Sequence, residues 1–156
     1  MDDPRPDSRR RLGLFGGSFD PIHGGHLHAA RVAQQAFDLQ RVVFVPAARP
    51  PHKPGLQLAP GAHRLAMIRL AIAPEPSWCA SDLELRRAGP SFTIDTVKVL
   101  ADEVGEPPDA LVHLILGTDN LPGLPSWRAV EELLARTQPV DVLRDDDAAE
   151  LSPEER

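Results

Sequence analysis

Short, continuous hydrophobic runs alternate along the chain with segments in which hydrophobic residues recur about every 3.6 positions. This alternation predicts that strands and helices alternate. Short apolar runs that stop at glycine, proline or charged residues predict buried strands over 12–15, 41–45, 78–85 and 110–116, with a last short strand over 140–143. Apolar residues spaced by about 3.6 positions predict helices over 26–37, 60–72 and 127–136. A further helix is expected to run from a cap at Ser91 or Thr93 to about Val104.

The order of these elements predicts the fold class. Strands that alternate with helices predict right-handed crossovers and a parallel sheet. We therefore expect an α/β protein, a Rossmann-like parallel sheet with helices on both faces. Ligands bind such sheets beyond the carboxyl ends of the strands. The residues that follow each predicted strand are thus the candidates for a functional site.

Composition limits the organisation of the chain and its partners. A chain of 156 residues supports one domain, which we place at 11–143 between a disordered tail over 1–10 and an acidic tail over 144–156. The net charge of −6 argues against binding along a nucleic-acid backbone. The single cysteine, Cys79, excludes an internal disulfide, and no apolar run approaches the roughly 20 residues that cross a bilayer. We expect a cytoplasmic protein without nucleic-acid or membrane partners, and homo-oligomerisation stays open.

The segment after the first strand carries the strongest chemical signal. Gly16 and Gly17 allow a ligand to approach the backbone closely or allow a positive φ. The helix that starts near Gly25 offers free N–H groups to phosphate, and His23 and His26 flank its entrance as further donors. A glycine-rich turn with incidental histidines is the alternative. A metal site is not expected, because no third ligand lies near this pair in the sequence.

Two cations follow the second strand. Lys53 lies in the proline-rich loop over 47–60, and Arg64 lies at the start of the next helix. Both are suited to phosphate, although cations in such positions are often only solvated.

Polar and aromatic residues follow the later strands. Ser91, Phe92 and Thr93 lie where the third helix begins, a position that serves capping and ligand binding alike. Asp119, after Gly117 at the fourth strand, can accept hydrogen bonds from ribose. Trp127 is either a core residue or a flat surface for stacking.

Five segments in order resemble one known family. These segments are GGSFDPIHGGH (16–26), PPHK (50–53), HRLAMIRLAI (63–72), GPSFTIDTV (89–97) and GTDNLPGLPSW (117–127). They are similar to the bacterial nicotinate-mononucleotide adenylyltransferases, members of the nucleotidyltransferase superfamily that carries the (H/T)-x-G-H motif. The resemblance covers about residues 11–136, and five motifs in order are more specific than any one of them.

The resemblance implies a reaction and its participants. ATP and nicotinate mononucleotide would react by in-line displacement to give the dinucleotide and pyrophosphate, with Mg²⁺ carried by ATP and not by a dedicated protein site. The implied catalytic residues are His23, His26 and Lys53. The implied nucleotide-binding residues are Gly16, Gly17, Ser18, Phe19, Gly25, Arg64, Gly117 and Asp119. The implied acceptor-binding residues are Ser91, Phe92, Thr93 and Trp127, with Phe92 at a position where the family often has Tyr.

The sequence departs from the family pattern at its end. Family members carry an ISSTxIR element whose arginine holds the triphosphate, and nothing like it follows Val140. Two alternatives therefore stay open. One is a truncated or diverged nucleotide-binding protein with little or no turnover. The other is an adenylyltransferase for a different phosphate acceptor, such as phosphopantetheine.

Overall fold

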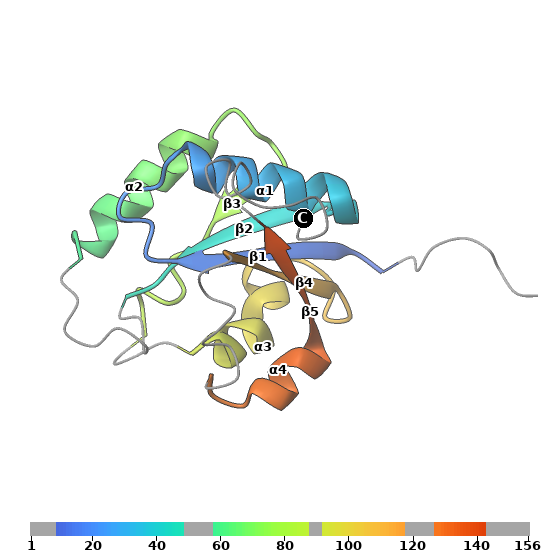
Figure 1. Cartoon of the computed structure of the whole chain (residues 1–156). Coiled ribbons are helices and arrows are strands. Elements are labelled where there is room, and N and C mark those ends of the chain that lie inside the picture. Colours follow the sequence, from blue (N-terminus) through green and yellow to red (C-terminus); the bar gives the residue numbers. More distant parts are fainter. Residues whose placement is uncertain (1–8, 49–57, 88–91, 118–126, 143–156) are drawn as a thin grey trace, which may run out of the picture.

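The computed structural model describes residues 9–48, 58–87, 92–117 and 127–142. These residues form one five-stranded parallel sheet with the order β3-β2-β1-β4-β5 (Figure 1). The strands are β1 (Arg11–Gly17), β2 (Arg41–Pro46), β3 (Trp78–Ala80), β4 (Leu111–Gly117) and β5 (Thr137–Val142). Across the described residues, no helix combines the length and the apolar character that a membrane span requires.

Helices cover both faces of the sheet, as the sequence predicts (Figure 1). Two helices, α1 (Gly24–Phe37) and α2 (Gly61–Ile72), lie on one face. The other two, α3 (Thr93–Glu103) and α4 (Val130–Arg136), lie on the opposite face. The α/β prediction with a Rossmann-like parallel sheet is therefore confirmed.

Strand β2 shows why the sheet needs both layers. Its side chains alternate between the two faces, as in any extended strand. Val42 and Phe44 join the core under α1 and α2, whereas Val43 and Val45 join the core under α3 and α4. All four are fully buried. The uninterrupted apolar run RVVFV is thus the pattern of a strand with no solvated face.

Several predicted boundaries were wrong by a few residues. The strand expected over 78–85 ends at Ala80, because the chain turns after it. Leu83 donates its backbone N–H to the Ser81 hydroxyl, and Arg86 donates its N–H to the Asp82 carbonyl. The helix expected from Trp127 begins only at Val130.

Thr93, one of the two residues expected to cap the third helix, does not occupy the cap position. Phe92 occupies the N-cap position and makes no side-chain cap hydrogen bond, while Thr93 is the first residue of α3. Ser91, the other candidate, lies outside the described residues. The tail proposed over 144–156 and most of that over 1–10 also lie outside them.

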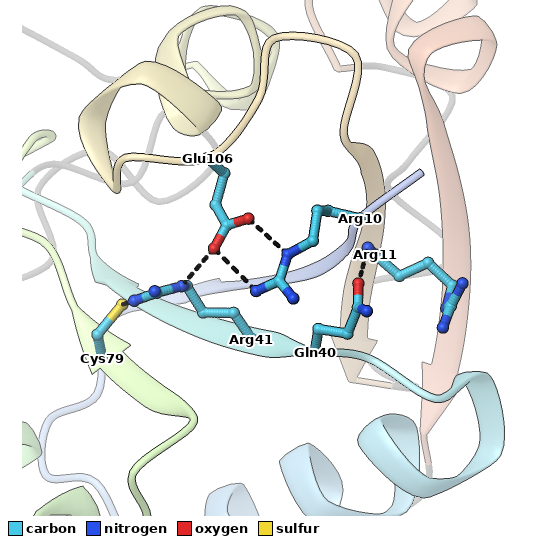
Figure 2. A network of polar contacts seen from close by, with 6 residues as sticks. All are labelled: Arg10, Arg11, Gln40, Arg41, Cys79 and Glu106. Carbon is cyan, nitrogen blue, oxygen red and sulfur yellow. Dashed lines mark hydrogen bonds and ion pairs between the residues drawn. The ribbon is translucent and has the colours of Figure 1, made fainter. Parts of the chain in front are cut away.

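An ion-pair network joins the amino ends of β1 and β2 (Figure 2). Glu106, in the connection between α3 and β4, accepts hydrogen bonds from Arg10 Nε at 2.8 Å and Arg41 Nε at 2.9 Å. Arg41 also approaches the Cys79 Sγ at 3.8 Å. The Glu106 side chain is only 5% exposed, and the hydrogen bond from Arg10, followed by that from Arg41, lowers its pKa. Arg10, which the sequence analysis placed in the amino-terminal tail, therefore packs against the domain.

The strand order places a functional crevice at a defined point. The chain moves from β1 outward to β2 and β3, then returns to β4 on the other side of β1. Such a reversal leaves a crevice at the carboxyl ends of the two central strands, where α/β proteins bind ligands. Gly17 and Gly117 end those two strands.

Candidate active site

Helix α1 begins directly above the end of β1 with two mutually supporting histidines. The His23 Nδ1 accepts a hydrogen bond from the Gly25 N–H at 3.0 Å, and the His26 Nδ1 accepts one from the His23 N–H at 3.1 Å. Each imidazole therefore satisfies a backbone donor that a helix start would otherwise leave unpaired. The two ring centroids lie 3.9 Å apart. The sequence prediction that His23 and His26 meet at the helix entrance is confirmed.

The capping hydrogen bonds also fix the chemistry of both rings. An imidazole nitrogen that accepts a hydrogen bond carries no proton, so the neutral ring bears its proton on the other nitrogen. His23 and His26 are both acceptors at Nδ1, which assigns the proton to Nε2. Each ring thereby becomes a donor at Nε2, the form that binds phosphate oxygens.

Gly16 and Gly17 lie at the end of β1 without any conformational need for glycine. Neither has a positive φ; among the described glycines only Gly105 does. A Cβ on Gly16 would meet only the Val45 carbonyl at 3.9 Å, and a Cβ on Gly17 would make ordinary contact with the Phe19 ring. The explanation by a positive φ was therefore wrong, and close approach of a ligand stays a prediction.

Phe19 forms the apolar wall behind the histidines. It is 2% exposed, and its ring packs edge-on against His26 with centroids 4.9 Å apart. Phe15 packs edge-on against both rings. Phe19 holds a left-handed backbone conformation with φ of 48°, which costs a non-glycine residue roughly 1–2 kcal/mol and needs support from its surroundings.

Arg64 lies beneath this segment and is 2% exposed. Its guanidinium donates to three backbone carbonyls, those of Ser18, Ala47 and Ala59, at 2.7–2.8 Å. Burial lowers its pKa from the ordinary arginine value. The sequence did not anticipate these carbonyl contacts, and a direct phosphate contact by Arg64 stays a prediction.

Three of the predicted acceptor-binding residues, Phe92, Thr93 and Trp127, are described, and two of them lie at the start of α3. Phe92 and Trp127 are partly buried and pack against the same hydrophobic core, and Thr93 starts the helix. The Arg128 guanidinium lies over the Phe92 ring, 3.9 Å from its centroid. No sequence signal marked Arg128, apart from its position next to Trp127.

A buried polar cluster behind α3 was also missed. The Thr96 hydroxyl, fully buried, donates to Glu84 at 2.5 Å and accepts from Arg87 at 2.9 Å. Burial raises the pKa of the Glu84 carboxyl, more than its hydrogen bond with Thr96 lowers it. The cluster ties the turn after β3 to the helix that carries Thr93.

Three predicted site residues cannot be placed. Lys53, Ser91 and Asp119 lie outside the described residues, so their roles stay predictions. For Gly117 only the backbone is described, as the last residue of β4. The described residues contain no group of three or more histidine, cysteine or carboxylate side chains that could hold a metal ion.

The fold and this site are those of the nucleotidyltransferase class of α/β proteins. A family model described as cytidylyltransferase-like matches residues 14–156, and the chain belongs to that family. A relative from Symbiobacterium thermophilum, named "Probable nicotinate-nucleotide adenylyltransferase", is 48% identical over 80% of this chain and 58% of its own length. A relative of the same name from Roseiflexus is 43% identical over 90% of this chain and 68% of its own. The resemblance inferred from the five motifs is confirmed.

A solved structure supports the fold at lower identity. Nicotinic acid mononucleotide adenylyltransferase from Plasmodium falciparum, complexed with NaAD, superposes with a TM-score of 0.74 at 20% identity. The match covers 94% of this chain and 69% of the Plasmodium protein. The chain spans about 60% of the length of the curated relatives it matches.

Proposed function

We propose that this chain transfers AMP from ATP to nicotinate mononucleotide and releases pyrophosphate, a step of NAD biosynthesis. A phosphate oxygen of the mononucleotide would attack the α-phosphorus of ATP as the bond from that phosphorus to the bridging oxygen breaks. The electron pair and the charge leave with pyrophosphate, and no bond to the protein forms. Such a reaction requires mainly positioning and stabilisation of charge.

The observation that carries the proposal is the histidine pair at the start of α1. Two Nε2 donors, a helix entrance and two glycines at which a Cβ would meet no tight contact lie together at the carboxyl end of β1. Donors fixed before the substrate arrives stabilise developing negative charge without reorganisation. Relatives with similar sequences carry the corresponding name, which supports the choice of reaction.

The other participants follow from the same proposal. Lys53 would contact phosphates and Asp119 would accept from ribose, while Ser91, Phe92, Thr93 and Trp127 would bind the pyridine mononucleotide. Mg²⁺ would enter on the ATP phosphates, because histidine and backbone N–H groups bind phosphate oxygens and not a hard cation. We expect the reaction to take place in the cytoplasm.

Two isosteric variants of His26 separate its two nitrogens. In His26→Asn the amide oxygen replaces Nδ1 and preserves the cap, but no group replaces Nε2. In His26→Gln the amide nitrogen replaces Nε2, but the cap acceptor is lost. We expect the asparagine variant to keep its melting temperature and lose at least about 100-fold in pyrophosphate release, the scale for one oxyanion donor. The glutamine variant should keep more activity and melt earlier.

Wild-type protein with ATP, Mg²⁺ and nicotinate mononucleotide provides the reference for this assay. Full turnover by His26→Asn would contradict the role assigned to Nε2. A wild-type protein that gains thermal stability with ATP but releases no pyrophosphate would support the non-catalytic alternative instead. Turnover only with phosphopantetheine would support the other acceptor.

A further inference from the structure

Arg64 binds three separate pieces of backbone at the carboxyl end of the sheet. Its Nε donates to the Ala59 carbonyl at 2.8 Å, and one terminal nitrogen donates to the carbonyls of Ser18 at 2.8 Å and Ala47 at 2.7 Å. Among the described residues it forms no ion pair, although the Asp20 carboxylate raises its pKa somewhat against the effect of burial. A buried charge that uses its donors in this way serves mainly to hold the chain.

The three carbonyls belong to segments that converge on the site. Ser18 follows β1, Ala47 follows β2, and Ala59 precedes α2. Two further hydrogen bonds join the same segments: the Ala47 N–H donates to the Gly17 carbonyl, and the Ala59 N–H donates to the Asp20 carboxylate. Arg64 is therefore the centre of the contacts that fix these segments to one another.

One of the three segments leads directly to His26. Ser18 precedes Phe19, whose left-handed backbone conformation is unfavourable for a residue with a Cβ. The Phe19 ring in turn supports the His26 ring edge-on at 4.9 Å. The hydrogen bond from Arg64 to the Ser18 carbonyl thus holds the residue next to the strained position, and through it the wall that orients His26.

We propose that Arg64 is a positioning residue, which orients His26 through Ser18 and Phe19. The inference rests on the proposed function of the histidine pair and adds a residue that acts through it. Lysine in place of Arg64 keeps the charge but offers one compact ammonium in place of a planar fork, so it cannot span the same three carbonyls. Displacement of a reacting group by about 1 Å can lower a rate roughly 100-fold.

The first test is the kinetics of Arg64→Lys, with Arg69→Lys as the matched control. Arg69 lies on the same helix and is exposed. We expect Arg64→Lys to lower kcat for pyrophosphate release by roughly 10- to 100-fold, with the KM for ATP changed by less than about threefold. The Arg69 variant should match the wild type. A raised KM for ATP at unchanged kcat would show a direct phosphate contact and overturn the proposal.

The second test needs no substrate and observes His26 itself. The ¹⁵N shifts of a histidine ring report which nitrogen carries the proton. In the free wild-type protein we expect the His26 signals of a ring protonated at Nε2. In Arg64→Lys these signals should move toward a mixture of tautomers, because the His26 ring loses its fixed orientation. Unchanged His26 signals in a folded Arg64→Lys protein would overturn the proposal, whatever the enzyme assay gives.

A third variant, Asp20→Ala, tests the proposal if Arg64→Lys does not fold. Asp20 is exposed, and Asp20→Ala removes its hydrogen bond to Ala59 and its charge near Arg64, while the three hydrogen bonds of Arg64 stay available. It should shift the His26 signals in the same direction as Arg64→Lys but less. Unchanged signals in Asp20→Ala would then overturn the proposal. Absence of wild-type turnover, with the His26 shifts as expected, would instead contradict only the proposed function.

Discussion

Two arginines at the amino end of the sheet donate hydrogen bonds to a carboxylate, whereas Arg64 at the carboxyl end donates its hydrogen bonds to backbone carbonyls. Arg10 and Arg41 share Glu106, so their charges are partly neutralised inside the protein (Figure 2). Arg64 is buried more deeply, and its hydrogen bonds go to the uncharged carbonyls of Ser18, Ala47 and Ala59.

This difference separates a stabilising region from a functional one. Ion pairs at the amino end attach the connection before β4 to the start of β1 and β2. At the carboxyl end, three backbone carbonyls hold the Arg64 guanidinium, and the Asp20 carboxylate acts on it through charge alone. The start of α1 adds the positive end of a helix dipole there. The carboxyl end therefore carries the groups that the proposed function requires, and the amino end carries those that join the strands.

Of the substitutions that test this comparison, the largest effect is expected for one that changes the carboxyl end without harming the fold. Gly16→Ala adds a Cβ that meets only the Val45 carbonyl at 3.9 Å. We expect unchanged or slightly higher stability, because alanine restricts the unfolded chain. The same Cβ would occupy space that the substrate needs, so kcat/KM for ATP should fall roughly 10- to 100-fold. Urea unfolding and pyrophosphate release measure the two effects, and unimpaired kcat/KM would contradict a close approach of substrate at Gly16.

The second prediction concerns the amino end of the sheet, where a substitution should lower stability and leave activity unchanged. Glu106→Gln removes the charge between Arg10 and Arg41, whose side chains are 40% and 35% exposed. We expect the free energy of unfolding to fall by about 1–2 kcal/mol, between the values for exposed and buried pairs. Activity at low temperature should remain, because the network is remote from the carboxyl end. A loss of kcat with unchanged stability would contradict the assignment of the amino end to stability and the carboxyl end to function.

The dependence of stability on acidic pH gives a further measure of the ion pairs that Glu106 forms with Arg10 and Arg41. Because its ion partners lower the pKa of Glu106 in the folded state, the unfolded chain binds more protons at acidic pH. The contribution of Glu106 to stability is therefore present above its ordinary value of 4.5 and is lost as the pH falls through the folded value. Glu106→Gln should reduce the slope of unfolding free energy against pH in that range.

The third prediction concerns an unsatisfied group in the middle of the sheet. His113 is buried at 8% exposure, and among the described residues its Nδ1 is the buried side-chain atom without a hydrogen-bond partner. Burial, followed by the charge of Arg11, lowers its pKa. We expect His113→Leu to raise the free energy of unfolding at neutral pH by about 1 kcal/mol. The exposed His63→Leu is the control, with a change within about 0.5 kcal/mol.

The pH dependence of stability due to His113 has the opposite sign to that of a histidine in an ion pair, because burial lowers the pKa of His113 and an ion pair would raise it. The folded protein resists the proton that the unfolded chain accepts below an ordinary value of 6.5. Stability contributed by neutral His113 is therefore lost as the pH falls through 6.5 toward the folded value. His113→Leu should remove this part of the pH dependence, and a pH profile identical to the wild type would contradict the assignment.

The smallest expected effect is at Cys79. Its sulfur lies 3.8 Å from Arg41, at the margin of the amino-end network. Sulfur is a weak acceptor, and Cys79→Ser should change the free energy of unfolding by less than about 0.5 kcal/mol. A much larger change in urea unfolding would show that the network depends on Cys79 as well as on Glu106.

Much of the fold was predictable because local pattern and tertiary structure agree. The apolar run RVVFV predicts a strand that is buried on both faces, and the side chains of β2 do pack in the cores on both faces of the sheet. The strand that begins at Trp78 was predicted too long, because the alternation of Leu83 and Leu85 also fits a turn, in which Ser81 and Asp82 accept hydrogen bonds from backbone N–H groups. Such side-chain and turn contacts depend on three-dimensional neighbours that periodicity does not reveal.

The site was predictable in its position and less so in its contacts. Strand ends and the spacing of His23 and His26 placed the histidine pair correctly. The burial of Arg64 could not be predicted, since a cation at the start of an amphipathic helix usually faces solvent. Its carbonyl partners come from segments 5 to 46 residues away in the chain, and only the folded sheet brings them together.

The burial of Arg64 also bears on how the protein responds to salt. Ions in solution screen exposed charges within roughly 8–10 Å at physiological ionic strength, but they reach a charge enclosed by protein far less well. Segments held together by exposed ion pairs would loosen as salt rose. With its guanidinium at 2% exposure, Arg64 should hold the Ser18, Ala47 and Ala59 segments together across the ionic strengths that a cell meets.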